Sequence, residues 1–264
     1  MKVGKVILLG AGGLLGKEIS RRWPGVSALP KKACDITDRS KLMTVVSAHK
    51  PDVIINCAAI TNIEICESDP LPSWEVNVVG VRNIAEAARR TGSYVVHFSS
   101  DYAVYPVNEY GWTKFASESL VPGLVMRCSF YNESHWLFRA LSAGKTVDLL
   151  NTNQFNPITI GNLLNYMEQL INIEYKGVIN IGVRNAASYF DFGCALCKIF
   201  GFDRKLVRPI ASIDVQYTRP TNTFLALDDL KGLGFKILSL EQDIGHLKNE
   251  TKKETNTHRK SSSR

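Results

Sequence analysis

The feature that most constrains the fold of this chain is a set of glycines directly after a short apolar segment. Residues 5–9, KVILL, are typical of a buried strand, and residues 14–23, LLGKEISRRW, have a helical pattern. The glycines follow the spacing G-x-x-G-x-x-G. In a strand–turn–helix unit the first glycine allows a tight turn, the second lets the backbone approach a pyrophosphate, and the third lets the helix pack closely on the strand. A purely structural turn is the alternative. The predicted dinucleotide-binding residues of this turn are Gly10, Gly13, Leu14, Leu15 and Gly16.

Strands and helices alternate through the first half of the chain. Short apolar runs that are typical of buried strands occur at 26–29, 51–56, 94–98 and 124–130. Helical patterns separate them at 38–50, at 74–90 and from Tyr110 onward. Because consecutive strands joined by helices form parallel sheets, the predicted class is α/β, a Rossmann-type doubly wound parallel sheet with a smaller C-terminal substrate lobe.

The alternation changes after about residue 130. Here the patterns predict a helix near 134–143, a strand near 146–150, a helix at 158–171, a strand at 177–182, a further helix around Cys194, an irregular stretch at 208–224 and two short helices at 227–234 and 238–249. We therefore predict an NAD(P)-binding domain at 1–130, a substrate-binding lobe at 131–250 with segments that return to the sheet, and a disordered basic tail at 251–264.

The composition is that of an ordinary globular protein, with 45% hydrophobic and 22% charged residues among 264. No apolar run approaches the length of a membrane span, and the first apolar run is not followed by a typical signal-peptide cleavage region. We therefore expect a cytoplasmic protein without a membrane partner. Five of the basic residues, against Glu254, lie in the tail, so the formal charge of +7 falls to +3 for residues 1–250. Nucleic acid is not an expected partner, although a weak contact through the tail is an alternative.

Cys194 and Cys197 have the spacing of a metal or redox pair. They lie in an apolar helical pattern and lack a second cysteine pair or a nearby histidine, so two buried helix-face thiols are the preferred interpretation. We expect all six cysteines to be reduced and no metal site.

Two segments at predicted strand ends suggest which dinucleotide binds. Lys31 and Lys32 follow the strand at 26–29, where an NAD-binding protein often carries an acidic residue for the adenosine ribose. Two lysines suit a 2′-phosphate, so NADP(H) is the predicted cofactor and NAD(H) the alternative; an exposed basic turn is the other explanation. Ala58 and Ala59 follow the strand at 51–56, where small residues suit a ligand lying against the sheet edge, although packing could also explain them.

Tyr110 is the only one of nine tyrosines with a lysine four residues further on. On a helix that begins near Tyr110, this spacing places Tyr110 and Lys114 on one face. A phenol titrates near pH 10, and a neighbouring ammonium and helix N-terminus lower that pKa. Such a tyrosine can donate a proton to a carbonyl oxygen and recover it later. The spacing also arises by chance, so its meaning depends on the rest of the chain.

Taken in order, the motifs resemble the extended short-chain dehydrogenase/reductases, and among them the dTDP-4-dehydrorhamnose reductase family. The resemblance runs through LLGAGGLLG, DITD, PDVIINCAAIT, WEVNVVGVRNIAEAA, VVHFSSDY and YGWTK, and then through FNPITIGNLL, GVINIG and TRPTNTFLALDDLKGLGF. It covers nearly all of residues 1–240. It implies an NADP(H)-preferring reductase of a 4-keto-6-deoxy nucleotide sugar in deoxysugar biosynthesis, with the nucleotide sugar as its partner, and it allows a homodimer.

The resemblance also implies roles for particular residues. Tyr110 would be the proton donor, and Lys114 would hold the nicotinamide ribose while lowering the tyrosine pKa. Ser100 would hydrogen-bond the substrate carbonyl. The glycines would cradle the pyrophosphate, and the residues implied to lie along the rest of the cofactor are Asp35, Ile36, Ala58 and Ala59. The implied substrate-binding residues are Ser100, Asp101 and Arg219, with a structural salt bridge as the alternative for Arg219.

One segment departs from the family pattern. Only nine residues separate Ser100 from Tyr110, whereas relatives carry a longer, acidic and proline-containing loop that contributes to the substrate mouth. Two other functions remain open on this scaffold. A nucleotide-sugar epimerase or dehydratase is the first, although no convincing Asp-Glu pair follows Ser100. A non-catalytic NADP-binding regulatory subunit, like the methionine adenosyltransferase β-subunit, is the second, and it would turn over no keto-sugar.

Overall fold

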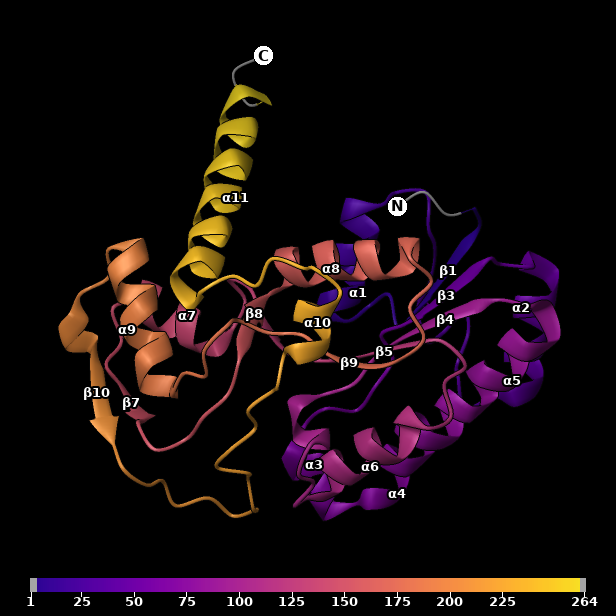
Figure 1. The fold of residues 1–264 in the computed structure, drawn as a ribbon, viewed down its shortest axis with the longest axis horizontal. Coiled ribbons are helices and arrows are strands. Elements are labelled where there is room, and N and C mark those ends of the chain that lie inside the picture. The colour runs from indigo at the N-terminus through magenta and orange to yellow at the C-terminus, as the bar shows by residue number, and fades with distance from the viewer. Residues whose placement is uncertain (1–3, 262–264) are drawn as a thin grey trace. The chain divides into compact units, whose positions relative to one another are not determined.

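Six parallel strands form the central sheet of the first of two units in this protein (Figure 1). The computed structural model describes residues 4–261, with side chains as far as Lys252. The strands in spatial order are β2 (Ser27–Leu29), β1 (Val6–Leu9), β3 (Val53–Asn56), β4 (Tyr94–Phe98), β5 (Leu124–Arg127) and β9 (Gly177–Asn180). All residues of β1 and β3 are buried, as expected for strands covered by helices on both faces. The predicted α/β class with a parallel sheet is confirmed.

Helices cover the two faces of this sheet. On one face α2 (Arg39–His49) packs against α5 (Val81–Thr91). On the other face α1 (Leu14–Arg22) meets α8 (Ile160–Asn172), where Arg22 and Glu168 pair at 3.6 Å. Helix α6 (Glu109–Glu118) connects β4 to β5.

The helix ends follow local sequence signals. Asp38 begins α2 by accepting a hydrogen bond from the Lys41 amide at 2.9 Å, so the helix predicted from residue 38 starts with its cap there. Gly92, with a φ of +72°, ends α5. Asn108 begins α6 by accepting from the Gly111 amide at 2.8 Å, so the helix expected near Tyr110 starts one residue earlier.

The segment before β4 differs from the single helix predicted at 74–90. The chain forms α3 (Ile63–Ser68), α4 (Pro70–Trp74) and then a π-helical stretch, η1 (Glu75–Gly80), before α5 begins. An apolar pattern read over so few residues does not separate an α-helical turn from a π-helical one. The difference matters because η1 carries Asn77, which hydrogen-bonds two other segments of this unit.

The first unit comprises the chain up to Cys128 together with Tyr166–Asn180 and Val215–Pro220, and the second comprises Ser129–Asn165, Ile181–Asp214 and the chain from Thr221. The single strand predicted at 124–130 is therefore wrong. Its first part is β5 of the central sheet, whereas β6 (Ser129–Tyr131) pairs with β8 (Pro157–Thr159) in the second unit.

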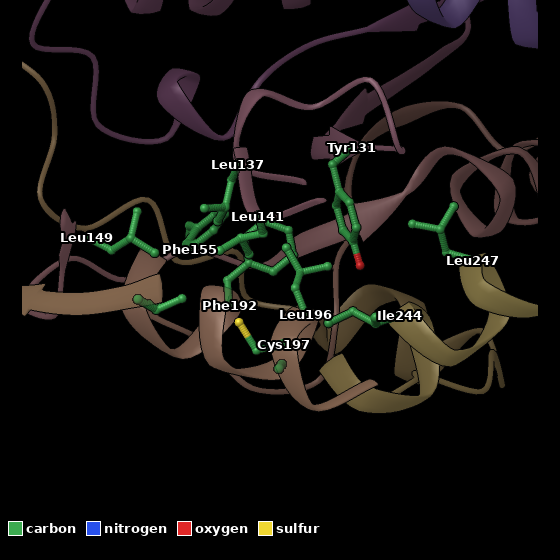
Figure 2. Packing of buried hydrophobic residues seen from close by; sticks show 12 residues of the cluster. Tyr131, Leu137, Leu141, Leu149, Phe155, Phe192, Leu196, Cys197, Ile244 and Leu247 are labelled. Atoms are coloured by element: carbon green, nitrogen blue, oxygen red, sulfur yellow. The ribbon is translucent and has the colours of Figure 1, made fainter. Parts of the chain in front are cut away.

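The second unit contains two small sheets and an apolar core. Besides β6 and β8, a parallel pair joins β7 (Val147–Leu150) to β10 (Val207–Ile210), and the helices are α7 (Trp136–Ser142), α9 (Tyr189–Phe200), α10 (Asp228–Gly232) and α11 (Leu240–Ser261). Figure 2 shows Phe192 and Leu196 of α9 in this core, with Ile244 and Leu247 reaching it from α11. Short elements explain the errors of the sequence analysis here: β8 replaces the start of the helix predicted at 158–171, and β10 lies in the stretch predicted to be irregular.

A buried carboxylate holds α11 in the second unit. Asp243 is fully buried and accepts hydrogen bonds from the Tyr131 hydroxyl at 2.7 Å, from the amide and hydroxyl of Thr159 at 2.9 and 2.8 Å, and from the Asn162 amide at 2.6 Å. From this anchor the helix continues to Ser261, because no glycine or proline follows Gly245 to end it. The predicted disordered tail, 251–264, overlaps this helix as far as Ser261, and residues 262–264 lie outside the described part.

All six cysteines are free thiols, and Cys197 is buried on α9. Within the described residues, no helix is long and apolar enough to cross a bilayer, and no group of histidine, cysteine and acidic side chains is arranged to hold a metal ion.

Candidate active site

The glycine turn lies where the order of the sheet reverses direction. From β1 the chain goes to β2 on one side and then to β3 on the other, and ligands of such sheets bind at the carboxyl ends of the strands at this point. Gly10 has a φ of +74°, and a Cβ there would lie 2.4 Å from the Ala58 amide nitrogen. A Cβ on Gly16 would lie 2.5 Å from the Gly10 carbonyl oxygen, so both positions require glycine. A Cβ on Gly13 would meet only an ordinary contact at 3.6 Å, so the protein itself does not demand glycine there.

A cavity of about 320 Å³ opens at this edge of the sheet. Its walls are the glycine turn after β1, Lys31 and residues 34–36 after β2, and residues 57–60 after β3. The predicted cofactor-binding residues that line it are Gly10, Gly13, Lys31, Asp35, Ile36, Ala58 and Ala59. The others do not line it: Leu15 and Gly16 are buried within α1, Leu14 and Lys32 are exposed, and Tyr110 and Lys114 lie on α6.

Lys31 and Lys32 differ in position although they are neighbours. The Lys31 ammonium lies 3.6 Å from the Asp35 carboxylate at the cavity wall, and its side chain remains largely exposed. Burial alone would raise the pKa of Asp35, but hydrogen bonds from Thr37 and the charge of Lys31 outweigh it, and the pKa lies below its ordinary value. Lys31 can therefore face an anion at the cavity, whereas Lys32 contributes its carbonyl oxygen to a hydrogen bond from Lys41.

The predicted tyrosine and lysine lie one turn apart on α6. Lys114 is 2% exposed and donates a hydrogen bond of 2.7 Å to the Phe98 carbonyl oxygen at the end of β4. Burial lowers the pKa of Lys114 to about 8. Tyr110 is half-buried, and burial raises the pKa of its phenol, while a hydrogen bond with Ser100 acts in the opposite direction. The predicted lowering of the Tyr110 pKa is therefore wrong for the protein alone, because burial outweighs the effects that lower it, and Tyr110 is a neutral proton donor at neutral pH.

Ser100 and Asp101 continue the hydrogen bonding from Tyr110. Both residues are buried, and the Ser100 hydroxyl lies 2.9 Å from the Asp101 carboxylate. A serine hydroxyl has one proton, which here points to Asp101. The hydrogen bond with Ser100 lowers the pKa of Tyr110, which is the direction expected when Ser100 donates to the phenolate, so the Ser100 hydroxyl must turn from Asp101 to make it. The Tyr102 amide also donates to the Ser100 oxygen, at 3.2 Å. For Ser100 to donate to a substrate carbonyl, as the resemblance implies, it must exchange its bond to Asp101.

Arg219 lies in the same unit as these residues, on the segment Val215–Pro220. Its guanidinium pairs with the Glu64 carboxylate and hydrogen-bonds the Tyr102 hydroxyl. The Tyr102 and Tyr110 rings are 5.8 Å apart between centroids. The salt bridge that the sequence analysis kept as an alternative is therefore present, and it also brings Arg219 to the neighbourhood of Tyr110.

Some residues of the site escaped the sequence analysis. Asn77 binds both the amide and the carbonyl of Ile60, at 2.8 and 2.9 Å, and donates to the Thr113 hydroxyl at 2.9 Å. Its position in a π-helical stretch leaves no signal in the sequence pattern. The cavity-lining residues that were not predicted are Gly12, Cys34, Cys57, Ile60 and Val76. Cys57 and Ile60 flank the predicted alanines, so their place at the end of β3 was the signal that could have found them.

The fold and the site together define a dinucleotide-binding protein of the short-chain dehydrogenase/reductase type. The cavity lies at the turn that requires glycine, and a tyrosine and a lysine lie one helical turn apart beside a buried serine. Comparison with known proteins narrows this class to one family. Residues 4–252 match the RmlD substrate binding domain family, and the chain belongs to that family.

Similar proteins cover most of the chain. A protein of Haloferax volcanii named "Probable low-salt glycan biosynthesis reductase Agl14" is 26% identical over 90% of this chain and 95% of its own length. A dTDP-4-dehydrorhamnose reductase of Mycolicibacterium smegmatis is 28% identical over 79% of this chain and 73% of its own. Among solved structures, the dTDP-4-dehydrorhamnose reductase of Bacillus anthracis in complex with NADP has a TM-score of 0.87 at 24% identity, covering 95% of this chain and 100% of that one.

Proposed function

We propose that this protein is an NADP(H)-dependent reductase of a 4-keto-6-deoxy nucleotide sugar in deoxysugar biosynthesis. The observation that carries the proposal is the hydrogen bond of Tyr110 with buried Ser100, one helical turn from buried Lys114. The family supports it, since relatives over most of the chain are named as reductases and dTDP-4-dehydrorhamnose reductases.

The residues of the cavity fit a dinucleotide. Gly10 approaches the end of β3 so closely that a side chain there would fill the space. Gly12 and Gly13, directly before α1, line the cavity, so a pyrophosphate bound there would face the N-terminus of α1. Asp35 and Ile36 form the wall at the end of β2, where the adenosine half would lie. When bound, the reduced nicotinamide supplies the hydride for the keto carbon. The solved relative with NADP supports the choice of cofactor, and Lys31 supports a 2′-phosphate.

The protein's own residues handle the proton. Tyr110 donates its phenolic proton to the carbonyl oxygen as the oxygen gains negative charge. The phenolate that remains is stabilised by the Lys114 ammonium, which burial keeps out of water on the same helix face. General acid catalysis of this kind contributes roughly 100- to 10,000-fold to a rate.

Asp101 and Arg219 are the proposed substrate-side residues. Asp101 accepts the proton of the Ser100 hydroxyl, so Ser100 can donate to Tyr110 or to a ligand only when this bond is exchanged. Arg219 carries the positive charge that can bind a nucleotide diphosphate, and its half-exposed pairing with Glu64 can be exchanged for a pairing with phosphate.

We expect the enzyme to act in the cytoplasm and to form a homodimer. The exposed side chains of Trp112 and Phe115 on α6 support the homodimer, and analytical ultracentrifugation tests it.

The decisive experiment measures NADPH oxidation with a panel of 4-keto-6-deoxy nucleotide sugars that differ in sugar configuration and in base. We expect turnover with at least one of them. Tyr110→Phe keeps the ring and should lower that turnover by roughly 100- to 10,000-fold without loss of NADPH affinity. Tyr105→Phe is the matched control, because Tyr105 is exposed, and it should behave as wild type.

Other outcomes would identify the rival functions. If no sugar causes NADPH oxidation although NADPH still binds, the protein would instead be a regulatory subunit. The short segment between Ser100 and Tyr110 is the observation that favours this alternative. Conversion of a nucleotide sugar without net NADPH oxidation would favour an epimerase or dehydratase. Retention of reductase activity by Tyr110→Phe would refute the role of Tyr110.

A further inference from the structure

We infer that His97 is a positioning residue, which couples the segment at the end of β3 to α6 through a directed chain of hydrogen bonds. We call residues 57–60 the cofactor bed, because they line the cavity. His97 lies on β4 and is 1% exposed. The effect of His97 on turnover rests on the proposed function, whereas its effect on dinucleotide binding does not.

Four consecutive hydrogen bonds lead from the cofactor bed to the carbonyl of Lys114. The Ala58 amide donates to the Asn56 side-chain oxygen at 3.0 Å, and the Asn56 nitrogen lies 3.1 Å from His97 Nδ1. His97 Nε2 lies 3.3 Å from the Ser117 hydroxyl, which donates to the Lys114 carbonyl oxygen at 2.8 Å. The three side chains that form this chain, Asn56, His97 and Ser117, are all buried.

The two ends of the chain fix its direction. The Ala58 amide can only donate, so the oxygen of Asn56 faces it and the NH₂ group of Asn56 faces His97. At the other end the Lys114 carbonyl can only accept, so the single proton of Ser117 points to it and the Ser117 oxygen accepts from His97. Both constraints are met by one form of the imidazole alone, the neutral tautomer with its proton on Nε2.

A charged His97 does not fit this arrangement. A proton on Nδ1 would face the NH₂ group of Asn56, so two donors would meet without an acceptor. Burial, and then the charge of Lys114, also hold the pKa of His97 well below its ordinary value. Both ring nitrogens are already bonded within the protein, so His97 has none left for a ligand. Its contribution is therefore to placement.

A second link joins the same two elements. Asn77 holds Ile60 at the far end of the cofactor bed and donates to Thr113, the neighbour of Lys114. Ala58 and Ile60 flank Ala59, so the bed is held on both sides to adjacent residues of α6. Since α6 also carries Tyr110, these links set where a bound dinucleotide lies relative to the proton donor. A displacement of about 1 Å between reacting groups can cost roughly 100-fold in rate.

Three variants test this inference. His97→Leu keeps an apolar volume of similar size and removes both hydrogen bonds. His97→Gln restores an acceptor and a donor on one planar group. Val95→Ala is the matched control for lost stability, because Val95 is equally buried and lies two residues earlier on the same strand, hence on the same face. For each variant we would measure the NADPH dissociation constant, the unfolding midpoint and kcat at saturating cofactor. The wild-type imidazole tautomer would be read from ¹⁵N chemical shifts.

For the wild type we expect the Nε2–H tautomer. For His97→Leu we expect a roughly tenfold weaker NADPH affinity, which corresponds to about 1.4 kcal/mol of binding free energy. We also expect its kcat to be lower by roughly 10- to 100-fold. His97→Gln should recover most of both, and Val95→Ala should stay within about twofold of wild type despite its lower midpoint. An imidazole protonated on Nδ1 would overturn the inference, as would a His97→Leu variant that matches Val95→Ala. Should His97→Leu not fold, Ser117→Ala breaks the last link and must lower affinity and kcat in the same direction. If the wild type reduces no keto-sugar, the proposed function fails, while the tautomer and the NADPH affinities still decide the role of His97.

Discussion

Replacing Lys114 by methionine should lower activity without lowering stability at neutral pH. Lys114 is 2% exposed, and burial lowers its pKa from 10.5 to about 8. This difference in pKa corresponds to about 3 kcal/mol, the free energy by which folding disfavours the charged form of Lys114 relative to its neutral form. Lys114→Met removes that penalty and also removes the hydrogen bond to the Phe98 carbonyl, which costs about 1–3 kcal/mol if the oxygen is left unpaired. At pH 7 the variant should therefore be as stable as wild type or slightly more stable.

The pH dependence gives a sharper test. Between pH 8 and pH 10.5 the unfolded chain keeps the Lys114 proton that the folded protein has lost, so the unfolded state holds more protons and stability rises with pH. From pH 7 to pH 10 this contribution to wild type should grow by about 2.5 kcal/mol, and Lys114→Met should lack it. The free energy of unfolding of both proteins would be measured by urea denaturation, without cofactor, at several pH values. The difference between the two profiles isolates Lys114, because every other titrating group is common to both.

Two parallel profiles would refute this reasoning, since they would mean that Lys114 keeps an ordinary pKa in the folded protein. The activity of Lys114→Met should fall further than that of Tyr110→Phe, because both the charge beside the phenolate and the anchor for a ribose are lost. A variant that loses activity because it unfolds would be recognised at once from the same denaturation curves.

Three further perturbations follow from the geometry. Lys31→Ala should weaken NADPH binding by about 1.5–3 kcal/mol in calorimetric titrations and leave NADH binding unchanged. Lys32→Ala is the control and should have no effect, because of the two lysines only Lys31 lines the cavity. Equal losses of affinity for both variants would contradict this. Asp243→Ala should cost about 3 kcal/mol or more in urea denaturation, because it leaves several buried donors without their acceptor, and a loss below 1 kcal/mol would count against it. Deleting residues 253–264 should leave the melting temperature and NADPH affinity unchanged, because that part of the sequence contains no apolar side chain that could join Ile244 and Leu247 in the core. A clear drop in either quantity would show that the deleted residues contribute.

The central sheet was predictable because each of its strands carries its own signal. The runs in β1, β3 and β4 are short, apolar and buried, and the turn at Gly10 combines a positive φ with a close approach that only glycine permits. Such constraints act within a few residues, so the sequence shows them directly. The cavity then follows from the strand order, because the ends of adjacent parallel strands meet at one edge.

The features that were missed depend on contacts between distant segments. The residue that Arg219 pairs with is 155 positions away, and the partners of His97 are 41 and 20 positions away. No periodicity marks such residues. The break between β5 and β6 also leaves the apolar pattern intact, since both halves of the run are strands and differ only in the sheet that they join. Local propensity identifies an element, whereas its partner is decided by tertiary packing.

The short connection between Ser100 and Tyr110 is held in place by a segment that is distant in the sequence. The nine residues fold back on the first turn of α6 so closely that a Cβ on Gly111 would lie 3.0 Å from the Tyr102 carbonyl oxygen. Asn108 caps α6 with its side-chain oxygen and donates its NH₂ group to the Thr218 carbonyl at 3.0 Å. One side chain thus satisfies the helix start and attaches the segment Val215–Pro220, whose Arg219 reaches Tyr102. Arg219 is thereby held near Tyr110, and its pairing with Glu64 leaves it half-exposed. An anionic ligand that took the place of Glu64 would therefore bind beside the proposed proton donor.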